Sequence, residues 1–261
     1  MTTHHLSPLL SVLGVMVCLP LLAQGRGADW PRDATVASEN IGFISVGAAF
    51  DHTDREMRLN DGELVMLHSR SVYGMASCDL VSWLTLTAGG GQSQVKPEDF
   101  DPYGDNKAMW MAGAKWTIWD FPLSEPPWLM SLFRVETSVS YWQNKAVLMD
   151  QDMDWHEWRG TLTVSAERYV EEWGKDSTVI PYSLLFYAGC AYSQVGGDVH
   201  LSPAAATAAG TDKMGFDEED SFAVIGGIDF FISHNLSIGA EARAFDGTRN
   251  YAYTGSMALH F

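Results

Sequence analysis

The chain ends in a stretch of strict two-residue alternation, residues 249–261 with the sequence RNYAYTGSMALHF. Every second residue from Tyr251 to Phe261 is apolar, aromatic or glycine, whereas the residues between them, from Ala252 to His260, are small or polar. A period of two is that of a β-strand, whose successive side chains point to opposite faces of the sheet. We therefore predict a strand whose two faces meet two different environments.

The start of the chain has a different character. Residues 9–22 (LLSVLGVMVCLPLL) form an apolar run that is followed by small residues up to Gly25. This run is shorter than the roughly 20 residues that a spanning helix needs, and it has the layout of a secretory signal peptide. We predict a signal peptide over 1–25, a short periplasmic segment over 26–40 and one domain over 41–261.

The rest of the chain is rich in apolar residues but contains no long apolar run. It is 46% hydrophobic and 12% aromatic, yet no stretch after residue 25 is long enough to cross a bilayer as a helix. A transmembrane β-barrel distributes its apolar residues in this way, because every backbone group must pair within a closed sheet. The final strand, with Tyr253 inside it and Phe261 at its end, resembles that of bacterial outer-membrane β-barrel proteins. The resemblance implies that Tyr253 and Phe261 form the signal that the barrel-assembly machinery reads.

The alternating segments predict a closed antiparallel barrel of ten strands, with short and long connections in turn. If one of the first two segments is not a strand, eight strands is the alternative. Aromatic residues near the expected strand ends fit interfacial girdles; these are Trp83, Trp119, Trp128, Trp142, Trp158 and Phe231. The expected strands are residues 41–51, 63–77, 82–92, 106–119, 128–142, 157–170, 179–194, 221–231, 236–245 and 249–261.

The polar faces of these strands carry charges of both signs. Charges that share one interior pair with each other, and a barrel of this size is largely filled by its side chains. We therefore expect a closed lumen crossed by ion pairs, with a narrow channel as an alternative. We also place His68 and Arg70 on the inner face. The expected lumen charges are Lys115, Arg134, Glu136, Arg159, Glu167, Asp229, Glu241 and Arg243.

Two loops pair acidic residues with a two-residue spacing. Asp99 and Asp101 fall in the second long loop, and Asp198 and His200 begin the fourth. On extended backbone this spacing places both side chains on one face, where an aspartate can orient a histidine as a general base. The arrangement resembles the omptins, ten-stranded outer-membrane proteases with such pairs in these loops. The resemblance implies that the four residues activate a water for peptide hydrolysis, but Gly196 stands where omptins carry an acid.

A third acidic cluster, Asp150, Asp152 and Asp154, offers oxygen ligands to a divalent cation such as calcium. It does not complete a calcium-loop signature, because Trp155 stands where the loop needs glycine. We expect no other cofactor. Cys78 and Cys190 fall at different heights in the expected barrel, so we predict that they form no disulfide.

The formal net charge of −17 argues against nucleic acid as a partner. We predict an integral barrel of the bacterial outer membrane, a monomer surrounded by lipid and lipopolysaccharide, with a structural or surface-binding role and no catalysis. The omptin-like protease and the narrow channel remain the alternatives.

Overall fold

A computed structural model describes residues 44–60, 62–81, 83–98, 102–122, 132–148, 151–169, 183–218, 221–233, 236–246 and 250–261. The expected signal peptide and the segment 26–40 lie outside these residues. Ten described strands form the barrel wall. They are β1 (Ile44–Leu59), β2 (Leu64–Val81), β3 (Leu84–Pro97), β4 (Lys107–Pro122), β5 (Leu132–Leu148), β6 (Gln151–Tyr169), β7 (Ser183–His200), β9 (Phe222–Ser233), β10 (Leu236–Phe245) and β11 (Tyr251–His260).

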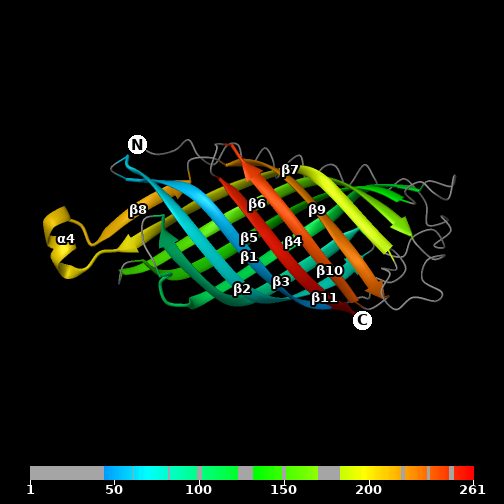
Figure 1. The fold of residues 1–261 in the computed structure, drawn as a ribbon, viewed down its shortest axis with the longest axis horizontal. Helices are drawn as coiled ribbons and strands as arrows, with labels where there is room; N and C mark the ends of the chain where they lie inside the picture. The colour runs from blue at the N-terminus through cyan, green and yellow to red at the C-terminus, as the bar shows by residue number, and fades with distance from the viewer. Residues whose placement is uncertain are drawn as a thin grey trace.

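The ten strands close into a ring (Figure 1). Each strand pairs antiparallel with its neighbour in chain order, β7 pairs with β9, and β11 pairs with β1. The closing pair runs from Ser45 opposite His260 to Asp54 opposite Tyr251, and the Phe261 amide donates to the Ile44 carbonyl at 2.9 Å. The prediction of a closed, antiparallel, ten-stranded barrel is confirmed, and β10 has the expected bounds.

The outward face of the wall is apolar and ends in aromatic residues. Along β6, Leu162 and Val164 are exposed, whereas Thr163 and Ser165 are buried. An upper aromatic belt crosses the wall, and Trp119 and Phe121 lie toward its opposite end. The belt consists of the outward-facing residues Trp110, Tyr141, Trp158, Tyr192, Phe222, Tyr251 and Tyr253. Such belts mark the two boundaries between lipid and water.

Two aromatic residues expected in the girdles are inside instead. Trp142 is buried with its ring edge-on to Tyr73, and Phe231 is also buried. The register explains the first case, because Tyr141 lies opposite outward Trp158 and Trp142 must therefore face inward. Trp83, Trp119 and Trp158 are exposed, and Trp128 lies outside the described residues.

Beyond the upper belt the strands continue where we expected long loops. Residues 52–59, 143–148, 151–156 and 195–200 are strand rather than loop. A further strand, β8 (Lys213–Glu218), follows the short helix α4 (Pro203–Ala209) and pairs with both β7 and β1. Figure 1 shows β8 and α4 beyond the ends of β9, β10 and β11. We call β8 together with residues 55–59, 64–69, 93–97, 143–148, 151–157 and 194–200 the collar.

No helix among the described residues is long and apolar enough to cross a membrane.

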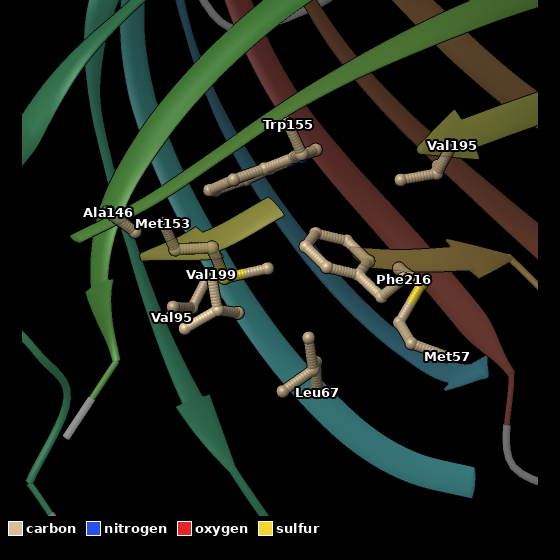
Figure 2. Packing of buried hydrophobic residues seen from close by; sticks show 9 residues of the cluster. All are labelled: Met57, Leu67, Val95, Ala146, Met153, Trp155, Val195, Val199 and Phe216. Carbon is tan, nitrogen blue, oxygen red and sulfur yellow. The ribbon is translucent and has the colours of Figure 1, made fainter. Parts of the chain in front are cut away.

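The collar reverses the polarity of the wall below it. In β6, Asp152 and Asp154 face outward while Met153 and Trp155 are buried inside, whereas lower on the same strand the apolar residues are the outward ones. The reversal follows from the surroundings, since water replaces lipid outside the collar. Nine buried side chains from seven segments fill the collar (Figure 2): Met57, Leu67, Val95, Ala146, Met153, Trp155, Val195, Val199 and Phe216. We call them the plug.

Candidate functional site

A layer of buried charges crosses the lumen directly below the plug. Arg159 donates to Glu157 through Nε at 2.6 Å and through Nη2 at 2.8 Å, and the same Nη2 lies 3.5 Å from Asp51 Oδ2. Arg243 Nε donates to Glu241 at 2.8 Å, and its Nη2 lies 3.8 Å from Asp51 Oδ1. Asp51, on β1, therefore joins guanidinium groups from β6 and β10. The charges of the layer alternate in sign, so each guanidinium group lies against carboxylates rather than against another cation.

Arg55 connects this layer to β8. Its Nη1 lies 2.9 Å from Glu218 Oε1, and its Nη2 lies 3.1 Å from Glu157 Oε1. The guanidinium also stacks over the Phe245 ring, with 4.1 Å between Cζ and the ring centroid. Only 3% of Arg55 is exposed, so one guanidinium ties together β1, β6 and β8 inside the barrel.

Ser193 lies between two carboxyl groups of this layer. Its Oγ lies 2.8 Å from Arg55 Nη1, 2.9 Å from Glu157 Oε1 and 2.9 Å from Glu218 Oε2. The arginine can only donate, and a hydroxyl has a single hydrogen, so Ser193 can donate to just one of the two carboxylates at a time. The two carboxyl groups compete for this hydrogen, which favours protonation of one of them. Burial, with a smaller contribution from nearby Glu157, raises the pKa of Glu218 to about 7 despite the opposing effect of Arg55.

The lumen charges expected nearer the other end of the barrel all face inward. Lys115 Nζ lies 3.3 Å from Glu136 Oε1. Arg134 Nε donates to Asp120 at 2.7 Å, and buried Glu167 accepts a hydrogen bond from Ser183 at 2.7 Å. Asp229, on β9, forms no ion pair with any described residue.

The space below the charged layer is not completely filled. A cavity of about 170 Å³ lies against Arg159 and Arg243. Hydroxyl groups of Ser138, Ser140 and Thr161 line its wall. A cavity of this size with polar walls suits ordered water, which needs several polar partners for each molecule.

Two residues that we expected in the lumen face outward. His68 lies opposite Asp54 and Arg70 opposite His52, on the same face of β2 as exposed Val72. The expectation was wrong because β2 passes above the belt at this point. On the outer surface of the collar the strands meet water, so their polar residues face outward.

The four residues of the omptin-like arrangement are only partly described. Asp99 and Asp101 lie outside the described residues. Asp198 and His200 project outward from the collar on β7. His200 Nε2 lies 3.3 Å from Asp154 Oδ2, and Asp198 Oδ2 lies 3.9 Å from Lys213 Nζ. The acid that contacts His200 is thus Asp154, on the neighbouring strand.

The proposed calcium ligands are spread along an ion-pair ladder. Asp152 lies 3.3 Å from Lys107 Nζ and Asp154 lies 3.5 Å from Lys145 Nζ, while Asp150 is outside the described residues. In the part of the chain that the structure describes, no group of three histidine, cysteine or acidic residues is arranged to hold a metal. Cys78 and Cys190 are both free.

Sequence reasoning missed the residues that organise the charged layer. Asp51 is the last residue of the expected first strand, Arg55 lies in the stretch that we expected to be the first loop, and Glu218 lies in the expected fourth loop. Residues 151–157 do show the alternation of a β-strand, because Met153 and Trp155 are separated by the acidic Asp154 and flanked by polar residues. We interpreted this stretch as a loop because we expected the outward residues of a strand to be apolar, as they are on a membrane strand, whereas here they are polar.

Comparisons with known proteins agree with the general fold only. No protein-family model matches the sequence, and no curated protein matches it. Among solved structures, the translocator domain of the autotransporter NalP from Neisseria meningitidis is 10% identical and has a TM-score of 0.39, with 95% of this chain and 98% of that chain covered. The outer membrane protease OmpT from Escherichia coli is 9% identical, with a TM-score of 0.41 and coverage of 84% and 96%. Ail from Yersinia pestis is 10% identical, with a TM-score of 0.31 and coverage of 84% and 99%. These values are too low to support an argument about function.

Proposed function

We propose that this protein is a sealed, non-conducting barrel of the bacterial outer membrane that acts by binding at its surface, without passage or catalysis. The observation that carries the proposal is the plug, which lies in the collar above a layer of ion pairs. The collar faces the cell exterior in this proposal. Lipopolysaccharide and other outer-membrane lipid surround a single barrel, which the assembly machinery inserts after export through the periplasm.

The two layers oppose passage for different reasons. The plug consists of buried apolar side chains, so an ion that entered it would lose its hydration. The layer below is polar, but its guanidinium groups are held by carboxylates at 2.6–3.8 Å. A solute would have to break several buried ion pairs to pass, at a cost of several kcal/mol for each charge left unpaired.

The protease alternative has less support from the residues described. His200 and Asp198 face outward from the collar, and both are engaged by partners on neighbouring strands. The interior beside them is occupied by Val195, Val199 and Phe216 of the plug. A general base needs a water and a bound substrate within hydrogen-bond reach. The described residues form an ion-pair ladder at this point instead.

Conductance in planar bilayers tests the proposal. Refolded wild-type protein should insert and give no steady current at either polarity, because both layers remain closed. The matched control lacks residues 201–218, which removes β8 and Phe216, and carries Arg55→Ser and Arg159→Ser. This variant keeps the ten wall strands and leaves Glu157 without its two arginine partners and Asp51 with Arg243 alone, so it should conduct with cation selectivity. A steady current from the wild-type protein would overturn the proposal.

A further inference from the structure

Among the described elements, β8 alone closes the collar between β7 and β1. The wall strands between these two do not enter the collar, because β9 begins at Phe222, β10 ends at Phe245 and β11 begins at Tyr251. Figure 1 shows β8 beyond their ends. β8 pairs with five residues of β7 and three of β1. If β8 left its place, β1 and β7 would become the two open edges of the collar sheet.

Few side chains hold β8 in the collar. Phe216 is buried and is its one member of the plug. The Phe216 ring lies where Gly197 of β7 has no side chain, since a Cβ atom on that glycine would come within 2.7 Å of Phe216 Cζ. Lys213 and Asp217 are exposed, and Met214 is only partly buried. The attachment of β8 therefore depends on one buried ring, one inward carboxyl group and short strand pairing.

The inward carboxyl group, that of Glu218, is the fourth in a layer with three guanidinium groups. The wall strands supply three carboxyl groups and all three guanidinium groups, and β8 supplies the fourth carboxyl group. An ionised Glu218 would thus add a buried negative charge for which the layer has no further cation. The seven members are Arg55, Arg159 and Arg243 with Asp51, Glu157, Glu218 and Glu241.

The surroundings of Glu218 offer limited compensation for such a charge. The charged groups of the described residues that face it are Arg55 on β1 and Glu157 and Arg159 on β6. Arg55 is shared with Glu157, and Ser193 on β7 is shared in the same way. Glu218 Oε1 is buried and accepts no hydrogen bond from a described atom, although Arg55 Nη1 lies 2.9 Å away. Burial raises the pKa of Glu218 to about 7, and nearby Glu157 adds to this effect.

We propose that β8 is a proton-controlled strap, which is docked in the collar while Glu218 holds its proton and is released when Glu218 ionises. In the docked state the neutral carboxyl group hydrogen-bonds with Ser193 and adds no charge to the layer. Release moves the ionised carboxylate into water and leaves three cations with three anions. Release also withdraws Phe216 from the plug, whereas the other plug residues belong to wall strands and stay in place.

Hydrogen exchange of refolded protein in detergent, followed by mass spectrometry at pH 5 and pH 8, tests the proposal. Rates are corrected for the intrinsic pH dependence of amide exchange. Docked β8 holds the Glu218 proton up to about pH 7 and released β8 only to about pH 4.5, so docking should weaken as pH rises between these values. Protection of the amides of 213–218 should fall about 50–100-fold from pH 5 to pH 8. The amides of β10 should stay protected at both pH values while β8 exchanges.

Two variants assign the effect to Glu218. Glu218→Gln keeps the shape but cannot ionise, so the protection of β8 should change little between the two pH values. Asp217→Asn is the matched control, since it removes an exposed carboxyl group on the same strand and should keep the wild-type pH dependence.

Three results would overturn the strap. They are wild-type protection of β8 that does not change with pH, the same change in Glu218→Gln, and exchange of β8 only together with β10, which would mean that β8 opens only when the whole barrel unfolds. Exchange measures the docking of β8 and not ion current. A failure here therefore leaves the sealed barrel standing, and a conducting wild-type protein would leave the strap standing.

Discussion

Ser193 shows how one hydroxyl group connects three ionisable residues inside the barrel. Three groups approach its hydroxyl within 2.9 Å, and two of them are carboxyl groups. Only one of these can accept the single hydroxyl hydrogen at a time, so the arrangement favours protonation of the other. Glu218 is the member on β8, whose pKa burial raises to about 7. The attachment of β8 to the charged layer is therefore linked to pH.

The linkage has a definite sign. The folded barrel keeps the Glu218 proton up to about pH 7, whereas the unfolded chain releases it near pH 4.5. The folded state binds more protons between these values, so its stability should fall as pH rises from 4.5 to 7 and then remain level. The full effect of this shift is roughly 3 kcal/mol. We predict a lower urea midpoint at pH 8 than at pH 5 for wild-type protein refolded in detergent.

Glu218→Gln is the control for that prediction. Glutamine keeps the shape and a donor toward Ser193 but cannot titrate, so the difference between the two midpoints should shrink. Other groups titrate equally in both proteins and cancel in the comparison. If the variant retains the whole pH dependence, Glu218 is not the titrating group.

Other site residues illustrate what sequence reasoning can and cannot reach. Arg159, Glu241 and Arg243 were identified because they occupy polar positions within clearly alternating strands. Arg55 and Glu218 were missed, since their pairing depends on β8 returning between β1 and β7. A contact between residues 163 positions apart has no local signal in the chain.

At the scale of elements, the strands were predicted well within the bilayer and poorly above it. The apolar-out, polar-in pattern was sufficient for β10 and for most of β6. Above the belt the same period of two continues with reversed polarity, as in Met57 inward and Arg58 outward on β1. Because both environments use the period of two, only the polarity of the outward residues distinguishes lipid from water.

The seam between the first and last strands depends on His260. Its Nδ1 lies 2.9 Å from Ser45 Oγ on β1, and its Nε2 lies 2.9 Å from Ser237 Oγ on β10. One ring thus connects three strands at the end opposite the collar. We predict that His260→Ala lowers the free energy of unfolding of the refolded barrel by about 1–3 kcal/mol, because two hydrogen bonds are lost together. Urea titration in detergent measures the change.

The Ser45→Ala and Ser237→Ala variants refine this test. If the histidine makes both contacts, the effects of either serine variant and His260→Ala should not add, since each removes the same interaction. Additive effects in both pairs of variants would contradict the two hydrogen bonds of His260. Refolding without the assembly machinery separates this structural role from recognition of Phe261.

At the scale of the whole molecule, the membrane-facing barrel continues into the collar, whose apolar side chains point inward and whose polar side chains point outward, as in a soluble protein. The lipid-facing wall has a polar, ion-paired interior, and the collar above it has an apolar one. The closed sheet and its ten strands were predictable from alternation, because a chain with so many apolar residues and no long run must distribute them on one face. The collar was not, since it requires β8 to bridge two strands that are not neighbours in the wall.

The account rests on the claim that the outward face of the wall meets lipid. Nitroxide labels at each position from 161 to 166 of β6, placed one at a time in a Cys78→Ser/Cys190→Ser background in bilayers, test this directly. Oxygen, which concentrates in lipid, should reach labels at 162, 164 and 166 and should reach those at 161, 163 and 165 far less. Equal accessibility along the strand, or access of a water-soluble nickel chelate to 162 and 164, would contradict it.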